Sequence, residues 1–146
     1  MKITFLIALI MIISLSQAYE NMTYSNGQEV LDKLEDGSDD INLIMFYVSG
    51  LQGGTHNVRT TEDEKELISR VLNKHPSFKY AKVNADDEKY SDLIKAVGIN
   101  TAELHESPSV LLMEGGTGVW IHGPQTVNRI SEFADDYEKK VSGNKD

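Results

Sequence analysis

The chain has 146 residues, of which 40% are apolar, and its formal net charge at pH 7 is −9. This length and apolar content indicate one globular domain with its own core. The acidic balance argues against nucleic acid as a partner, because contact with phosphates requires a basic face. The sequence contains no cysteine, so no disulfide supports the fold.

Residues 1–18 have the layout of a cleaved secretory signal peptide. Lys2 precedes the apolar run 3–15, and Ser16-Gln17-Ala18 provides the small residues of a cleavage site. The apolar run is shorter than the roughly 20 residues that a membrane span needs. We therefore expect cleavage after Ala18, a domain over residues 19–146, and no membrane span in the mature chain.

A secretory route gives meaning to the triplet Asn21-Met22-Thr23, which is an N-glycosylation sequon. Asn21 lies close to the expected new N-terminus and is a candidate glycosylation site if the chain reaches the lumen. The last residues, 143–146, do not resemble a K-D-E-L retrieval signal. The expected location is therefore the lumen of the endoplasmic reticulum, a secretory granule or the extracellular space.

Hydrophobic periodicity next predicts alternating helices and strands. The run 41–48 is apolar on both faces, as a buried central strand should be. Capping-box spacing at Ser25 to Gln28 and at Thr61 to Glu64 predicts two helix starts around that strand. The predicted segments in this part of the chain are a helix over 25–37, a strand over 41–48, a polar loop over 49–60, a helix over 61–76, a strand over 78–83, and a helix from Asp86 or Asp87 to Gly98.

The remaining chain predicts a hairpin and a covering helix. A strand over 109–113, a glycine-containing turn over 114–118 and a short strand over 119–121 have the spacing of an antiparallel hairpin. The last helix, over 128–141, is expected to bury Ile130, Phe133, Ala134 and Tyr137, and the tail 142–146 is expected to be loose. Alternating units followed by a hairpin predict an α/β fold with a mixed sheet.

This order of elements resembles the thioredoxin-like superfamily, and several local sequences agree with it. Leu43 to Tyr47 is similar to the strand that leads into the family's active site, and the segment 78–86 is similar to the strand that ends in Asn or Asp before the third helix. The family's V-G-I, its cis-proline before a strand and its hairpin glycines have counterparts at Val97-Gly98-Ile99, Pro108 and Gly115-Gly116. The resemblance covers roughly residues 25–141. It implies a mixed β-sheet sandwiched between helices, with a C-terminal β-hairpin and helix.

The resemblance also implies that the redox site is degenerate. Active members open the second helix with C-x-x-C, whose thiolate is stabilised by the helix N-terminus. Counting from Phe46 places Leu51, Gln52, Gly53 and Gly54 at that motif, and none of these residues can exchange a disulfide. Met45 stands where members bury an acidic proton acceptor. We therefore expect no thiol-disulfide oxidoreductase activity, no enzyme activity and no cofactor.

Two segments are longer than their counterparts in the family, one after Phe46 and one between Ile99 and Pro108. Both lie at the carboxyl ends of strands, where open α/β sheets bind ligands, although drift of tolerated loops explains them equally well. His56 and His105 lie on these segments and are candidate partner-binding residues. They lack H-x-x-x-H spacing, so the sequence predicts no metal site. His75, before Pro76, is interpreted as an ordinary helix-end residue.

Ser107 and Pro108 form the expected cis-proline loop. In the family, this loop presents backbone groups to an extended peptide, and a purely structural role in the turn is the alternative. The sequence thus favours a redox-inactive protein of the secretory pathway that binds protein or unfolded polypeptide, similar to the non-catalytic domains of protein disulfide isomerases. The alternatives are a structural or storage component of a granule or extracellular assembly, and an enzyme of another class.

Overall fold

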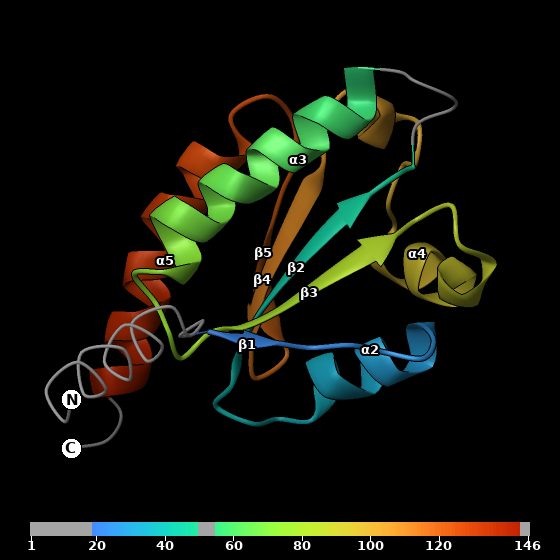
Figure 1. Ribbon diagram of the computed structural model, residues 1–146. Helices are drawn as coiled ribbons and strands as arrows, with labels where there is room; N and C mark the ends of the chain where they lie inside the picture. Colours follow the sequence, from blue (N-terminus) through green and yellow to red (C-terminus); the bar gives the residue numbers. More distant parts are fainter. Residues whose placement is uncertain (1–18, 50–54, 144–146) are drawn as a thin grey trace, which may run out of the picture.

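The computed structural model describes residues 19–49 and 55–143 (Figure 1). The predicted signal peptide, 1–18, and the predicted degenerate motif, 51–54, lie outside these residues. No helix in the described part of the chain is long and apolar enough to cross a membrane.

A five-stranded mixed sheet forms the centre of the molecule, with strand order β1-β3-β2-β4-β5. The central strand β2 runs parallel to β3 and antiparallel to β4, and β5 completes the hairpin with β4. The predicted central strand and the predicted hairpin are therefore confirmed. The strands are β1 (Glu20–Asn21), β2 (Ile41–Tyr47), β3 (Lys79–Asn84), β4 (Ser109–Glu114) and β5 (Thr117–Ile121).

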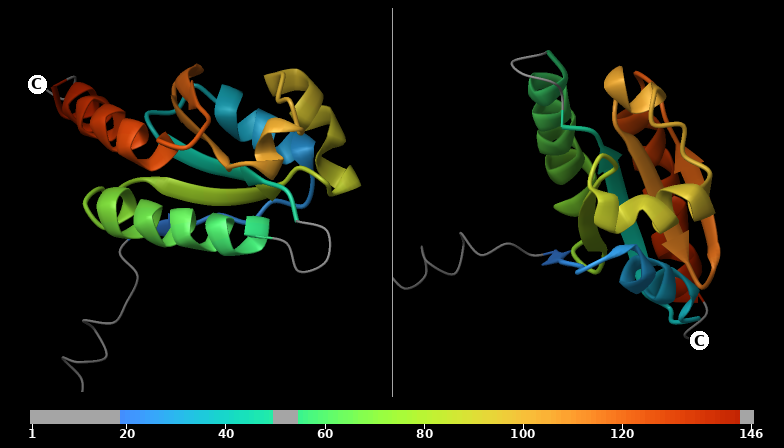
Figure 2. Two further views of the ribbon diagram at one scale, coloured as in Figure 1. Left: turned by 90° about the horizontal axis from the view of Figure 1, so that it is seen from above. Right: turned by 90° about the vertical axis from the view of Figure 1, so that its right-hand side faces the viewer.

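Helices cover both faces of this sheet (Figures 1 and 2). One face packs against α3 (Thr55–Leu67), its π-helical continuation η1 (Ile68–Leu72) and α5 (Thr126–Gly143). The other face packs against α2 (Gly27–Glu35) and α4 (Ser91–Val97), with the short turn η2 (Glu88–Tyr90) leading into α4. The predicted α/β sandwich is confirmed.

Strand β2 contributes side chains to the hydrophobic cores on both faces of the sheet, because its successive side chains point to opposite faces. Ile41, Leu43 and Met45 belong to the core under α3 and α5, whereas Ile44 and Phe46 belong to the core under α2 and α4. The two cores explain why the run 41–48 is apolar throughout. Its polar member Asn42 is only 5% exposed.

Glycine is required at the hairpin positions for two different structural reasons. Gly115 and Gly116 adopt φ values of 55° and 78°, which fits a tight turn with left-handed backbone. Gly118 lies in β5, where an added Cβ would stand 2.3 Å from Met113 Cγ and 2.8 Å from the Leu112 carbonyl oxygen. A side chain at residue 118 would therefore push β5 away from β4.

Several predicted boundaries are corrected. The N-cap of α2 is Asn26 rather than Ser25, because the Asn26 side chain accepts the Glu29 amide at 3.0 Å. Helix α3 begins at Thr55 rather than Thr61, so much of the predicted loop is helical; no glycine or proline interrupts residues 55–67. Helix α5 begins at Thr126 and continues through Gly143, so part of the tail expected to be loose is helical.

Strand β1 was absent from the predicted elements. It is only two residues long and pairs in parallel with the start of β3, Glu20 beside Lys79 and Asn21 beside Tyr80. Tyr19 packs edge-on against Tyr80 with ring centroids 6.0 Å apart and is buried in the core under α3. This buried ring anchors a strand that is too short for sequence periodicity to reveal.

Candidate functional site

A cleft of about 160 Å³ lies between α3 and the sheet, close to the carboxyl ends of β2 and β3. In the sequence, the predicted degenerate motif follows the strand β2 that ends here. The lining residues come from three elements: Tyr47 from β2, Thr60, Thr61 and Glu64 from α3, and Lys82 from β3. We call this the strand-end cleft.

Glu64 organises the strand-end cleft. One of its carboxylate oxygens accepts the Tyr80 hydroxyl at 2.7 Å, and the other accepts the Lys82 ammonium at 3.2 Å. Burial, followed by the hydrogen bond to Glu64, raises the pKa of Tyr80 far above its ordinary value. The phenol therefore stays protonated and acts as a hydrogen-bond donor. Its oxygen also lies 3.6 Å from the Met45 sulfur.

The sequence interpretation missed this arrangement. It assigned Glu64 to a capping box and noted only that Met45 replaces the buried acid of redox-active members. The structure brings a carboxylate toward Met45 from α3 instead of from β2. A usable signal was present: Glu64 lies one helical turn before the buried Leu67, which places it on the sheet-facing side of α3.

Polar side chains also tie the ends of β2 and β3 together. The side-chain amide nitrogen of Asn84 donates to the Ser49 hydroxyl at 3.3 Å, and that hydroxyl lies 3.5 Å from the Asp86 carboxylate. The side-chain oxygen of Asn84 accepts a hydrogen bond from the backbone amide of Asp86 at 3.0 Å. These contacts hold the rim of the sheet in place at the same end as the cleft.

The two candidate histidines are only partly described. His56 lies in the first turn of α3, and its side chain is outside the described part of the structure. His105 ends the short 3-10 turn η3 (Glu103–His105) and is exposed. Their role in binding a partner remains a prediction. No group of three or more His, Cys, Asp or Glu side chains in the described residues is arranged to hold a metal.

The prediction of a cis-proline loop is wrong. No peptide bond in the described residues is cis, so the Ser107–Pro108 bond is trans, the isomer that such bonds intrinsically prefer. Ser107 and Pro108 are both buried. The Ser107 amide donates to the Glu103 carbonyl at 3.4 Å, so η3 delivers the chain into β4 and uses the group that was expected to meet a peptide.

His75 is more than a helix-end residue. Its ring is only 5% exposed and stacks on Phe78 with centroids 4.8 Å apart. Nε2 lies 2.9 Å from the Asp135 carboxylate, and Nδ1 contacts the carboxylate of Glu138. His75 thereby links the end of η1 to α5. We call this three-residue arrangement the His75 clamp.

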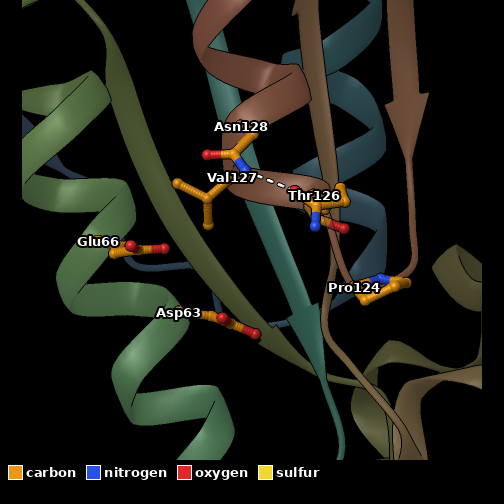
Figure 3. Close-up of a pocket in the computed structure, with 7 residues that line it drawn as sticks. Asp63, Glu66, Pro124, Thr126, Val127 and Asn128 are labelled. Atoms are coloured by element: carbon orange, nitrogen blue, oxygen red, sulfur yellow. Dashed lines mark hydrogen bonds between the residues drawn. The ribbon is translucent and has the colours of Figure 1, made fainter.

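A second, smaller pocket lies where α3 approaches the start of α5 (Figure 3). Asp63 and Glu66 line it from α3, and residues 124–128 line it from the other side. Its volume of about 30 Å³ suits a water molecule rather than an organic ligand. Nearby, the Arg70 guanidinium donates to the Asn128 side chain. Together with the His75 clamp, these groups make the contact between α3–η1 and α5 polar along its outer rim.

The strand order, the helices on both faces and the hairpin define a thioredoxin-like fold, which this chain carries without any cysteine. No protein-family model and no curated protein matches the sequence. Solved structures of thioredoxins do match in three dimensions. Thioredoxin O2 from Arabidopsis thaliana superposes with a TM-score of 0.57 at 16% identity, over 82% of this chain and 94% of that one.

Two further thioredoxins are similar to the same extent. The protein from Trypanosoma brucei brucei gives a TM-score of 0.59 at 13% identity, over 84% of this chain and 93% of that one. The protein from Fasciola hepatica gives 0.55 at 11% identity, over 81% and 98%. Identity this low establishes the fold alone. Because the chain has no thiol, it cannot itself form or exchange a disulfide.

Proposed function

We propose that this chain is a redox-inactive, thioredoxin-like binding protein of the secretory pathway that holds unfolded or extended polypeptide. The observation that carries the proposal is the strand-end cleft. It occupies the end of the sheet where open α/β folds bind ligands, and it is lined by hydroxyl, carboxylate and ammonium groups that can donate and accept hydrogen bonds, with no thiol. Such a lining supports recognition by hydrogen bonds and charge rather than covalent chemistry.

The charge distribution favours basic or neutral clients. The chain has 23 acidic residues against 14 basic ones, and Glu64 places one carboxylate directly in the cleft. Unfolded segments rich in Lys or Arg would gain from this field, while acidic segments would be repelled. The burial of Ser107 and Pro108 moves the expected contact away from the proline loop and toward α3 and β3.

Purified protein is expected to suppress the aggregation of reduced, unfolded lysozyme, a basic client, and to show no insulin reduction. Glu64→Ala should require severalfold more protein for the same suppression, because the cleft loses its carboxylate. Glu66→Ala is the matched control, since Glu66 is exposed on the same helix outside this cleft. Circular dichroism checks that both variants remain folded.

Light scattering of the client decides between the alternatives. Aggregation that proceeds unchanged in the presence of the wild-type protein would refute the binding function and favour a structural or storage role. Measurable insulin turnover would show that the protein is not redox-inactive. Equal suppression by Glu64→Ala and the wild type would remove the cleft from the proposal.

Expression of the full chain in secreting eukaryotic cells tests the secretory part of the proposal. We expect a mature N-terminus at Tyr19 and a glycosidase-sensitive band, because Asn21 and Thr23 are both exposed on and after β1. Asn21→Gln should abolish the mobility shift, whereas Thr23→Ser keeps the sequon and should retain it. An uncleaved chain that stays inside the cell would contradict the assignment.

A further inference from the structure

Strand β3 is covered along only part of its outer edge. Its inner edge pairs with β2 from Lys79 to Asn84. Its outer edge pairs with β1 only at Lys79 and Tyr80, because β1 ends at Asn21. Among the described residues, the carboxyl half of β3 is therefore an edge of the sheet, directly beside the strand-end cleft.

Hydrogen bonds show which backbone groups face this edge. The Tyr80 carbonyl points outward, because it accepts the Met22 amide at 2.7 Å, and the Phe78 carbonyl likewise accepts the Glu20 amide at 3.4 Å. On the inner side, the Ala85 amide donates to the backbone carbonyl of Tyr47 on β2 at 2.7 Å. Alternation along a strand then places the amide and the carbonyl of Lys82 on the outer edge.

Among the described residues, the outward amide of Lys82 donates no backbone hydrogen bond to another segment, and its outward carbonyl accepts none. The next outward carbonyl, at Asn84, accepts the Asp87 amide at 3.1 Å, so the available edge is centred on Lys82 and the Asn84 amide. The Lys82 side chain is 47% exposed. An unpaired strand edge of this kind is a template for an added strand.

The charges around this edge identify the chemistry of an occupant. Carboxylates lie around this edge at Glu64 on α3 and at Asp86 and Asp87 just after β3. Glu64 is paired with Lys82 at 3.1 Å and Asp87 with Lys89 at 3.9 Å, so Asp86, which meets the Ser49 hydroxyl at 3.5 Å, is the carboxylate of this group that no described Lys or Arg neutralises. A second copy of this chain, with its net charge of −9, would meet strong like-charge repulsion there. A segment that carries Lys or Arg would be attracted.

We propose that the β3 edge at Lys82 takes a basic, extended polypeptide segment as an added strand, with one of its side chains entering the strand-end cleft. This inference rests on the proposed polypeptide-binding function and names its docking surface. Backbone hydrogen bonds supply affinity that is largely independent of client sequence, and the cleft supplies preference for particular side chains. Both properties suit a protein that holds unfolded chains.

Lys82→Pro tests the edge directly. Proline removes the outward amide of Lys82 but leaves the inner ladder to β2 intact, and edge strands tolerate proline in this orientation. Lys82→Ala is the matched control, because it removes the same side chain and keeps the amide. The probe is a short soluble peptide that alternates valine and lysine. We expect Lys82→Pro to bind it at least about tenfold more weakly than Lys82→Ala, from the loss of the added-strand hydrogen bonds.

Two further measurements keep the test valid if Lys82→Pro folds poorly. In the wild-type protein, the amides of Lys82 and Asn84 should exchange hydrogen more slowly when the peptide is added. A backbone N-methylated version of the peptide should bind at least about tenfold more weakly, because it cannot complete a ladder. A valine-glutamate peptide should also bind more weakly, because it meets the flanking carboxylates.

The outcomes separate the edge from the function. If Lys82→Pro protects the client as well as the wild type, or if the N-methylated peptide binds equally well, the β3 edge is not the docking surface. The proposed polypeptide-binding function would still stand. Neither peptide binding nor client protection by the wild type would overturn both. Self-association of the wild type in sedimentation, abolished by Lys82→Pro, would show that a second copy occupies the edge and would overturn the basic-segment assignment.

Discussion

Replacing His75 by alanine is expected to lower the free energy of unfolding by about 3 kcal/mol. The imidazole is almost fully buried, stacks on Phe78 and contacts two carboxylates of α5. Alanine leaves a void beside Phe78 and removes the link between the end of η1 and α5. Urea unfolding followed by circular dichroism measures the change.

His122→Ala is the matched control for the His75 clamp. His122 also faces a carboxylate, Glu103 at 3.4 Å, but both side chains are about half exposed, so we expect a change within about 0.5 kcal/mol. Asp135→Asn and Glu138→Gln should each have smaller effects than His75→Ala, because their carboxylates are 61% and 40% exposed. A loss for His75→Ala no greater than that for His122→Ala would show that the clamp is not a structural link.

Tyr80→Phe is expected to lower the free energy of unfolding by about 2 kcal/mol at neutral pH, because it removes a buried hydrogen bond to a carboxylate. The same variant should change the response to alkali. The pKa of Tyr80 is raised by burial and by Glu64, whereas an unfolded tyrosine loses its proton near pH 10. Stability from this group is thus complete below about pH 10 and decreases as the pH rises further, because only the unfolded chain then releases the proton.

Unfolding curves at pH 8 and at pH 10.5 measure both effects. The wild type should lose stability between these two values, and Tyr80→Phe should lose less. Tyr137→Phe is the control: burial also raises the pKa of Tyr137, so part of the alkaline loss should persist in each single variant. Identical alkaline losses in Tyr80→Phe and the wild type would remove the Tyr80–Glu64 hydrogen bond as the source.

The main elements of the fold could be predicted because they depend on local patterns. The apolar run of β2 is buried as expected, and so are Ile130 and Ala134 of the last helix. The hairpin turn lies at Gly115 and Gly116, as the sequence predicts. Element boundaries were less accurate, because capping-box spacing also occurs inside helices, as Thr61 and Glu64 show.

The candidate site could not be predicted in the same way. Glu64 and Tyr80 belong to different elements, and so do His75 and its partners Asp135 and Glu138. Such contacts depend on how helices pack on a sheet, which no local pattern encodes. The proline loop failed for a different reason: the resemblance to the superfamily supplied an isomer that this chain does not adopt.

The two cores that share β2 have a consequence for how the sheet is aligned. A strand whose side chains are apolar on both faces could shift by one residue against its neighbours and still bury only apolar groups, apart from Asn42. The register of β2 against its neighbours must therefore be set by residues outside the strand. Gly118, which admits no side chain against Met113, fixes the hairpin, and Lys79, held 2.9 Å from Asp40, fixes the start of β3. The segment that is easiest to recognise in the sequence thus depends most on its neighbours for its alignment.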